Sequence, residues 1–327
     1  MRAILCDNFG AIEGLRLGDA PDPAIGPHEV RLQMRAASVN FADTVMIAGK
    51  YQEMPELPFV PGLEGAGEII ELGAGVTGLA VGDRVMATLP RGAFAEQAVT
   101  EATQVYAIPD GLDFAEAAAV PVAYSTSHVA LTRRGALQPG ETLLVLGAAG
   151  GVGLTAVEIG KALGATVIAA ASGPEKLALA TAHGADHAID YTQDDLRSAV
   201  REITAGHGAD VIYDPVGGDA FNAALRCIAW EGRLLVIGFA SGEVPQAAAN
   251  YLLVKNASVV GVYWGAYRKN NPGVIRDSFA TLGRWFADGT LQKPHISHRL
   301  PLEQAVDALQ LLTSRRSTGK VVLTIGE

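Results

Sequence analysis

Residues 142–164, with the sequence TLLVLGAAGGVGLTAVEIGKALG, constrain the fold of this chain more than any other segment. They read as an apolar strand (142–146), a glycine-rich turn (147–153) and an alanine-rich helix (154–163). Such a turn lets the backbone approach a pyrophosphate, and the helix N-terminus directs unpaired N–H groups and its positive dipole end toward the phosphates. A glycine-rich turn alone is weak evidence, but between a buried-type strand and a helix it predicts a dinucleotide site.

The turn departs from the pattern G-x-G-x-x-G at one place. Ala148 stands where the first glycine is expected, while Gly150 and Gly153 hold the second and third places. We expect the phosphate contacts to come from the main chain of Ala149, Gly150, Gly151 and Val152. A tight strand–helix turn that binds no ligand is the alternative.

From about residue 113 onward, apolar strands alternate with helices. Helical stretches at 113–120 and 124–132 come first. Strands are then expected at 143–146, 166–171, 187–189, 209–214 and 234–237, with helices at 151–163, 174–183, 195–203 and 218–228. Strict alternation predicts a doubly wound parallel sheet of the Rossmann kind, covered by helices on both faces, and residues 258–262 would be a sixth strand at its edge.

The first third of the chain has short apolar runs separated by Gly and Pro turn signals, a pattern typical of an antiparallel β domain. Its strands are expected at 3–5, 30–34, 67–72, 84–88, 94–99 and 105–108, and Asn40 would cap a short helix at 40–50. Helices at 274–287 and 302–314 and a strand at 320–325 follow the doubly wound unit, so we expect this tail to return to the β domain. The predicted domains are 1–118 and 119–260, with the returning segment 261–327.

Composition narrows the classes of partner. The chain has 327 residues, of which 49% are hydrophobic and 18% charged, as expected for a globular protein of two domains. The net charge of −10 argues against nucleic acid or an anionic membrane as the main partner. With only Cys6 and Cys227, no disulfide framework is expected. No apolar run has membrane-spanning length and no secretory signal is evident, so we expect a soluble cytoplasmic protein.

The end of the second Rossmann strand discriminates between the two nicotinamide coenzymes. An NAD site usually carries an acid there, about 20 residues past the turn, to hold the ribose 2′-OH. Here the strand ends in Ala170-Ala171-Ser172 without an acid, so NADPH is favoured. Ser172, Lys176 and Tyr191 are the candidate ligands of the 2′-phosphate. A solvated helix lysine is the alternative for Lys176, and Glu175 would stabilise the helix dipole.

The glycine-rich turn and five further sequence motifs resemble those of the zinc-independent quinone oxidoreductase branch of the medium-chain dehydrogenase/reductase superfamily, and the resemblance covers essentially the whole chain. The further motifs are VNFADT (39–44), PFVPGLEGAG (58–67), GDRV (82–85), DPVGG (214–218) and TGKVV (318–322). The resemblance implies a mainly β GroES-like catalytic domain, split between the N-terminal part and the tail, around a Rossmann domain. It also implies an active site in the cleft between the two domains.

The zinc-dependent relatives carry a Cys shortly before the position of Asp43, and Gly-His-Glu where this chain has Gly62-Leu63-Glu64. Leucine cannot bind a metal, and Asn40 stands near the expected Cys. His295 and His298 form the one close histidine pair near a domain junction, and solvated loop residues explain them better. We therefore expect no metal.

Without zinc, hydrogen-bond donors must stabilise the oxyanion that forms when hydride reaches a quinone or an enone. The resemblance places Asn40 and Tyr51 in the substrate and nicotinamide cleft, with Asn40 as an amide donor and Tyr51 as a donor or a stacking partner. A helix N-cap for Asn40 and loop packing for Tyr51 remain open. A second tyrosine common in the bacterial branch is Val45 here.

Three further residues are expected to contact the cofactor. The resemblance brings Thr126 near the nicotinamide ribose or amide, although its hydroxyl could instead bond to its own helix. Gly238 and Phe239 end the fifth strand, where ligands collect in open α/β sheets, although Phe239 could be core.

The first hypothesis is an NADPH-dependent reductase of quinones or α,β-unsaturated carbonyls. The second is an enoyl-CoA reductase, for which the pairs Arg133-Arg134 and Arg268-Lys269 would bind the CoA phosphates, although surface charge explains them more simply. The third is an NADPH-binding protein without catalysis. We also expect a homodimer, because the apolar edge strand 258–262 would otherwise remain open.

Overall fold

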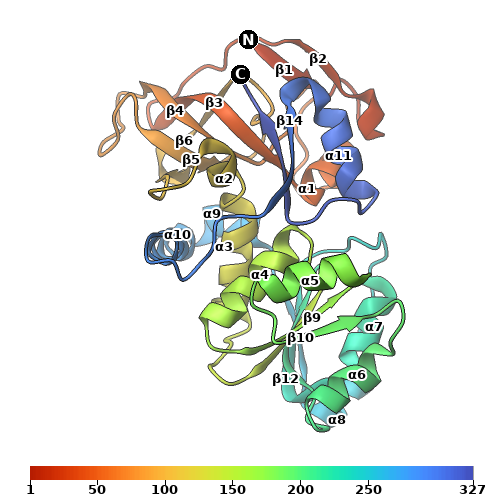
Figure 1. Cartoon of the computed structure of the whole chain (residues 1–327). Helices are drawn as coiled ribbons and strands as arrows, with labels where there is room; N and C mark the ends of the chain where they lie inside the picture. Colours follow the sequence, from red (N-terminus) through yellow and green to blue (C-terminus); the bar gives the residue numbers. More distant parts are fainter. Residues whose placement is uncertain (327) are drawn as a thin grey trace. The chain divides into compact units, whose positions relative to one another are not determined.

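The computed structural model describes residues 1–326, and the chain forms two compact units (Figure 1). The first unit contains Met1–Val122 and the tail from Lys293, and the second contains Ala123–Gln292. The tail thus leaves the second unit at Lys293 and not at residue 261. The reason is packing: Trp264 Nε1 donates to Ser125 Oγ (2.9 Å), and the Phe286 ring meets the Tyr124 ring edge-on with centroids 5.2 Å apart.

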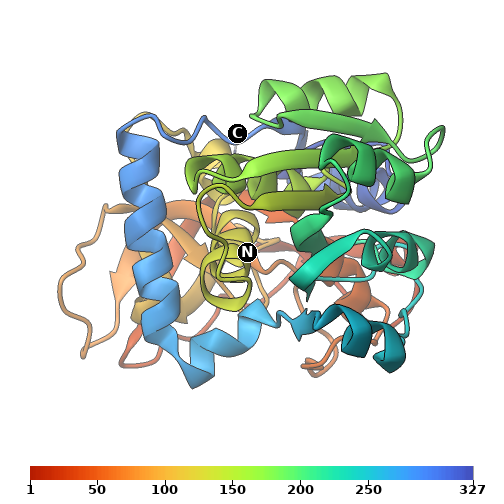
Figure 2. The ribbon, with the colours of Figure 1, turned by 90° about the horizontal axis from the view of Figure 1, so that it is seen from below.

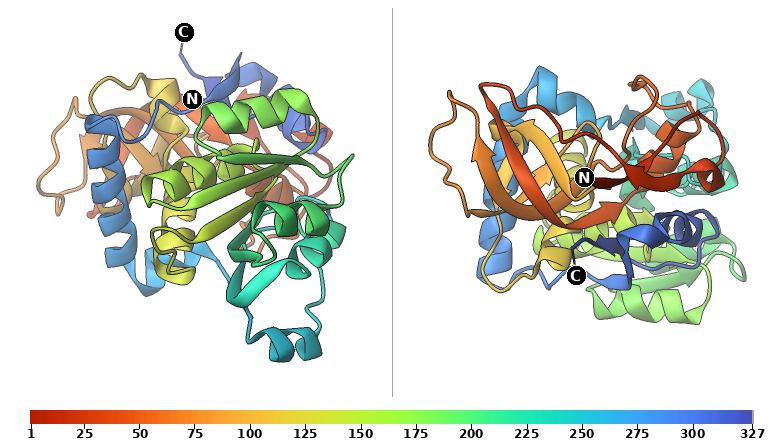
Figure 3. Two further views of the ribbon diagram at one scale, coloured as in Figure 1. Left: turned by 60° about the horizontal axis from the view of Figure 1, so that its bottom comes forward. Right: turned by 90° about the horizontal axis from the view of Figure 1, so that it is seen from above.

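A mainly antiparallel sheet of seven strands forms the first unit (Figure 3, right). Its strand order is β14-β15-β3-β4-β5-β7, and β6 pairs with β3; only β14 and β15 pair in parallel. The strands are β3 (Glu29–Val39), β4 (Glu64–Leu72), β5 (Arg84–Thr88), β6 (Gln97–Glu101), β7 (Val105–Ala107), β14 (Ile296–Pro301) and β15 (Lys320–Thr324). A separate pair, β1 (Arg2–Leu5) and β2 (Arg16–Asp19), is antiparallel.

Three short helices cover this sheet: α1 (Phe41–Ile47), α2 (Phe114–Ala118) and α11 (Ala305–Thr313). Asp113 caps α2 by accepting from the Glu116 backbone N–H (2.7 Å), and the Glu116 carboxylate accepts from the Asp113 N–H (2.8 Å). The core of the unit combines residues from both ends of the chain, including Val30, Leu32, Val321 and Leu323. The tail strand β15 pairs with β3, so the expectation that the tail returns to the β domain is confirmed.

The second unit is a parallel sheet with the order β10-β9-β8-β11-β12-β13. Its strands are β8 (Thr142–Leu146), β9 (Thr166–Ala171), β10 (His187–Asp190), β11 (Ala209–Asp214), β12 (Ile228–Val236) and β13 (Ser258–Gly261). Helices α4 (Gly151–Ala162) and α5 (Pro174–Ala182) cover one face, and α6 (Leu196–Ile203) and α7 (Gly218–Leu225) cover the other (Figure 3, left). The strands β8, β9 and β11 are buried on both faces, as their near-continuous apolar runs predict.

Further helices complete this unit: α3 (Pro121–Val129), which a π-helical turn (Ala130–Arg134) extends, α8 (Ala249–Lys255), α9 (Tyr267–Asn270) and α10 (Pro272–Ala287). The long blue helix in Figure 2 is α10. Among the described residues 1–326, no helix has the length and apolarity that a bilayer span requires.

Several predicted elements differ in their bounds. The helix predicted at 218–228 ends at Leu225, because β12 begins at Ile228 and is much longer than the predicted 234–237. The helix predicted at 124–132 begins at Pro121, a residue that suits a first helical position. Strands β2 and β14 and helix α8 were not predicted. β14 reads ISHRLP and buries none of its residues fully, so it lacks an apolar pattern.

Candidate functional site

The glycine-rich turn joins β8 to α4 within the second unit. Gly147 adopts a left-handed conformation (φ 59°), and Gly150 N–H donates to Gly147 O (2.9 Å). A Cβ on Gly153 would lie 2.1 Å from Gly147 O, so the turn closes this tightly only with glycine there. The first N–H groups of α4, from Gly151 and Val152 onward, have no carbonyl of their own helix to bind. This is the geometry that phosphate recognition by a helix N-terminus requires.

A buried hydroxyl cluster supports the turn, and the sequence prediction did not include it. Ser127 Oγ lies 2.8 Å from both Thr155 Oγ1 and Tyr213 OH, and it donates to Val152 O (3.0 Å). The cluster ties α3, α4 and β11 together beneath the first turn of α4. Its signal in the sequence is weak, because three hydroxyl residues in apolar elements have no fixed spacing.

Thr126 lies next to this cluster on α3 and is 7% exposed. Among residues 1–326, its hydroxyl makes no hydrogen bond to the helix backbone, so the back-bonded alternative for this residue is not observed. Thr132, on the same helical segment, does bond back to His128 O (2.6 Å). The Thr126 hydroxyl therefore keeps its hydrogen-bonding capacity for a ligand.

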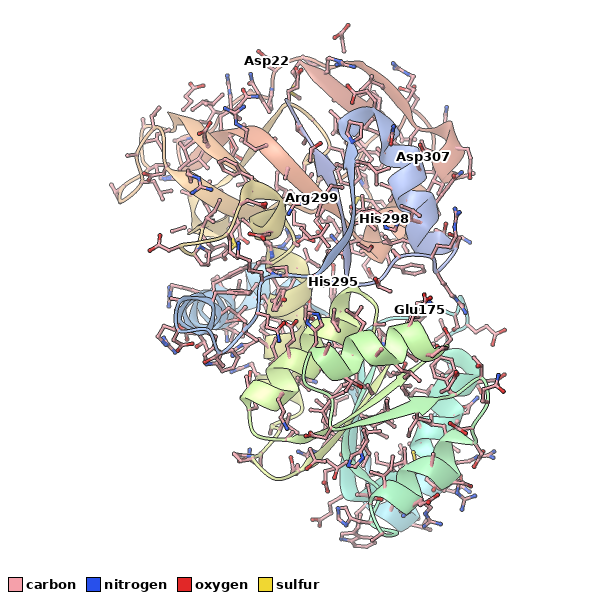
Figure 4. The ribbon with its side chains drawn as sticks, in the orientation of Figure 1. Asp22, Glu175, His295, His298, Arg299 and Asp307 are labelled. Atoms are coloured by element: carbon pink, nitrogen blue, oxygen red, sulfur yellow. The ribbon has the colours of Figure 1, made fainter. Side chains whose placement is uncertain are left out.

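Ser172 follows the end of β9 and is half-buried, and Lys176 lies one helical turn further on in α5. Tyr191 follows β10 and is 37% exposed. β10 pairs with β9, with Asp190 opposite Ala171, so Ser172 and Tyr191 extend from neighbouring strands at the same edge. Glu175 is in the first turn of α5 (Figure 4).

Asp190 is an acid near Ser172 that the sequence prediction did not consider, because it ends the third strand and not the second. Its carboxylate accepts from the Thr192 hydroxyl (2.6 Å), from Thr192 N–H (3.0 Å) and from Gly173 N–H (3.0 Å). The Thr192 hydroxyl is the main reason that the pKa of Asp190 lies below its usual value. The carboxylate thus holds the loop between Ser172 and α5 in place.

Gly238 and Phe239 follow β12 at the carboxyl end of the sheet, beside the loop after β11. Phe239 is half-buried, so it is not a core residue. Its ring packs 3.2 Å from where Gly217 would carry a Cβ. The neighbouring Asp214 accepts from Val216 N–H (2.7 Å) and Gly217 N–H (2.9 Å), and burial raises its pKa.

In the first unit, a buried network surrounds Asn40. Lys320 Nζ donates to Asn40 Oδ1 (2.7 Å) and to Glu64 Oε1 (2.9 Å), and Asn40 Nδ2 donates to the same Glu64 oxygen (2.8 Å). Glu64 Oε2 accepts from Val122 N–H (2.7 Å). The side chains of Lys320 and Glu64 are 5% and 0% exposed. Because ammonium only donates and carboxylate only accepts, this network fixes the orientation of the Asn40 amide.

Asp43, on α1, borders this network. One of its oxygens accepts from Asn40 N–H (2.8 Å), while Oδ1 is buried without a hydrogen-bond partner among the described residues. Burial is the main reason that the pKa of Asp43 rises to about 7, and the nearby Glu64 charge adds to this shift.

Tyr51 follows α1 and is half-buried against the core of the first unit. This contact with the core agrees with the alternative interpretation of Tyr51, in which its side chain serves loop packing. His295 and His298 lie on the tail strand region (Figure 4), where His295 Nε2 contacts Thr318 Oγ1 (3.1 Å) and His298 Nδ1 contacts Ser297 Oγ (3.0 Å). Within residues 1–326, no group of three or more His, Cys, Asp or Glu residues is arranged to hold a metal ion.

Comparison with known proteins adds to this geometry. The "Alcohol dehydrogenase GroES-like domain" family matches residues 26–110, and the "Zinc-binding dehydrogenase" family matches residues 151–280. The quinone oxidoreductase-like protein 2 homolog of Nematostella vectensis is 43% identical over 324 residues, which are 98% of this chain and 88% of the relative. The quinone oxidoreductase of Pseudomonas aeruginosa is 38% identical over 317 residues, 96% of this chain and 97% of the relative.

The chain belongs to the quinone oxidoreductase-like branch of the medium-chain dehydrogenase/reductase superfamily. The structure of Escherichia coli quinone oxidoreductase complexed with NADPH is 29% identical and has a TM-score of 0.91, covering 99% of this chain and 100% of that one. The predicted fold class, a Rossmann sheet with a mainly β GroES-like domain, is confirmed. In this chain, the GroES-like unit carries the network around Asn40 and the Rossmann unit carries the glycine-rich turn.

Proposed function

We propose that this protein is an NADPH-dependent, zinc-free oxidoreductase that reduces quinones or α,β-unsaturated carbonyls. The observation that carries the proposal is the glycine-rich turn at α4, whose tight closure at Gly153 leaves the first helical N–H groups to bind a pyrophosphate. Membership in the quinone oxidoreductase-like branch supports the reaction class. Bound NADPH supplies a hydride to the acceptor, and solvent supplies the proton that completes the reduced product.

The coenzyme site is proposed to consist of Ala149, Gly150, Gly151 and Val152 for the pyrophosphate, Thr126, Gly238 and Phe239 for the nicotinamide end, and Ser172, Lys176 and Tyr191 for the 2′-phosphate. The absence of an acid at the end of β9 supports NADPH over NADH. The Asp190 carboxylate accepts two hydrogen bonds from Thr192 and one from Gly173 N–H, so it is engaged in holding the loop after Ser172. A solved relative complexed with NADPH supports the same choice.

Asn40 and Tyr51 are proposed to bind the carbonyl oxygen of the acceptor. One Nδ2 proton of Asn40 is held by Glu64, while the other faces Ser38 O at 3.4 Å, near the limit of a hydrogen bond. This second N–H is the one we propose to turn to the developing oxyanion. Lys320 and Glu64 act on the reaction through Asn40, as positioning residues.

Replacing Tyr51 with phenylalanine tests this assignment. We expect kcat/KM for NADPH and a benzoquinone to fall by about tenfold or more, because a donor to the developing charge is lost. Absorbance loss of NADPH measures the rate. The matched control is Tyr106→Phe, which removes a surface hydroxyl that contacts Thr103 O (3.5 Å) and should leave the rate unchanged. No turnover of any quinone or enone by the wild-type protein would refute the proposed function.

Replacing Lys176 with alanine tests the coenzyme choice. Loss of a charged partner of the 2′-phosphate should weaken NADPH binding by about 10- to 100-fold and leave NADH binding nearly unchanged. Fluorescence titration with each coenzyme measures both constants, and Lys255→Ala on α8 is the control. Equal weakening for NADH and NADPH would show that Lys176 does not contact the phosphate.

An enoyl-CoA reductase is the second candidate function, but the structure gives two of its four proposed phosphate ligands other partners. Arg134 Nε donates to Gly261 O (3.1 Å), and Arg268 Nε contacts Gly265 O (3.4 Å). Competition of crotonyl-CoA with the quinone would nevertheless favour it. Coenzyme binding without turnover of either class would instead favour the non-catalytic NADPH-binding protein.

We also propose that two copies of the chain pair through β13. This strand lies at the edge of the Rossmann sheet, and exposed apolar side chains follow or precede it, including Leu253 (76% exposed) and Tyr263 (39% exposed). An open edge of this kind is a liability that self-pairing removes. Light scattering is expected to give the mass of a dimer, and a monomer at micromolar concentration would contradict the proposal.

A further inference from the structure

A pocket on the second unit gathers three arginines away from the glycine-rich turn. Arg197 and Arg201 lie one helical turn apart on α6, and Arg226 follows α7. With Asp195, Ser198 and Ala223 they line a pocket of about 350 Å³. Helices α6 and α7 cover the face of the sheet opposite α4 and α5 (Figure 3, left), so the pocket is separate from the phosphate-binding turn.

The charge of this pocket is unbalanced. Among residues 1–326, none of these three arginines forms an ion pair or a side-chain hydrogen bond, whereas Arg233 binds Glu141 (2.7 Å) in the same unit. The single acid of the pocket, Asp195, caps α6 by accepting from Ser198 N–H (2.9 Å), and the charge of the nearby Arg197 also lowers its pKa. Three exposed arginines against this one acid leave the pocket with a net positive charge.

Arg197, Arg201 and Arg226 line one pocket, so their like charges repel one another, and a bound anion would relieve this repulsion. The charges of Arg197 and Arg201 also act on the buried Cys227 thiol, where they lower its pKa against the larger effect of burial, which raises it to about 12.

The residue type indicates which anion. A guanidinium group presents N–H donors in a planar fork that matches phosphate oxygens, and it keeps its charge at any physiological pH. Three guanidinium groups provide more positive charge than one carboxylate would balance. The volume of the pocket is large enough for a small molecule. We propose that the pocket of Arg197, Arg201 and Arg226 binds a small polyphosphate anion at a second site on this protein.

Calorimetric titration of the full-length protein with inorganic pyrophosphate tests the proposal. Saturating NADPH fills the coenzyme site during the titration, and a parallel titration omits it. With NADPH present, we expect saturable binding that weakens about tenfold or more in Arg197→Gln/Arg201→Gln, because each lost charged hydrogen bond weakens binding by roughly that factor. Without NADPH, the glycine-rich turn should contribute a further site that the double variant keeps. Arg226→Gln alone provides a milder variant whose folding is checked by its thermal transition.

A matched control locates the site. Arg276→Gln, on α10, removes an exposed arginine of the same unit and should keep wild-type pyrophosphate affinity. Absence of saturable binding, or equal affinity in the double variant and the wild type, would overturn the proposal. Sulfate bound as tightly as pyrophosphate would overturn the choice of a polyphosphate.

Discussion

Replacing Lys320 with methionine is expected to lower the free energy of unfolding by about 3–5 kcal/mol. The substitution leaves the Glu64 carboxylate, which is fully buried, without its cation, and an uncompensated buried charge is strongly destabilising. It also frees Asn40 Oδ1, so the amide loses the contact that fixes its orientation. Urea unfolding of the variant and the wild type measures the difference.

A matched control uses the other lysine–glutamate pair of the same unit. Lys293 Nζ lies 3.0 Å from Glu116 Oε2, but the lysine side chain is 61% exposed, so Lys293→Met should change stability by less than about 1 kcal/mol. The double variant Lys320→Met/Glu64→Gln should recover part of the loss, since glutamine carries no charge. Equal effects of Lys320→Met and Lys293→Met would contradict the structure of the network.

Replacing Gly153 with alanine is expected to weaken NADPH binding by about 10- to 100-fold. The new Cβ would lie 2.1 Å from Gly147 O, and that carbonyl belongs to the turn itself, so the turn must open. Overpacking of this kind disturbs a structure by about 1–3 kcal/mol, which corresponds to the stated change in affinity if the displaced amides are those that bind the phosphates. Fluorescence titration with NADPH measures it.

Gly283→Ala on α10 is the control for the same chemical change. No atom lies within 4 Å of a Cβ at this position, so the Gly283→Ala variant should bind NADPH as the wild type does. The substitution should also stabilise the helix by about 0.5–1 kcal/mol. If Gly153→Ala also retains wild-type affinity, the turn at α4 does not bind the coenzyme. The proposed function would then lose its main support.

The Rossmann unit was the part of the fold most open to prediction from sequence. β9 (Thr166–Ala171) and β11 (Ala209–Asp214) have the predicted bounds, because their apolar runs end at local turn signals. β14 has no such signal, since none of its residues is fully buried and the strand is held by pairing with β15. The sequence pattern thus predicts strands that are apolar along their own length. It does not predict a strand such as β14, which exists because it pairs with another segment of the chain.

The candidate site shows the same division. The glycine-rich turn was recognisable because its residues are adjacent. Asn40 was identified from the family resemblance, but its partners Glu64 and Lys320 lie 24 and 280 residues away, so no spacing rule links the three. Asp190 does not follow from the sequence rule for a ribose-binding acid, because that rule applies to the end of the second strand, whereas Asp190 ends the third strand, which pairs beside it in the sheet.

The composition of the first unit from two distant stretches of chain has a consequence for synthesis. β3 emerges from the ribosome long before its partner β15, which begins at Lys320, so this sheet and its buried ion pair form only after the second unit has been translated. The second unit is continuous from Ala123 to Gln292 and has all its strands beforehand. The second unit can therefore fold first, and the carboxylate of Glu64 remains in contact with water until β15 pairs with β3.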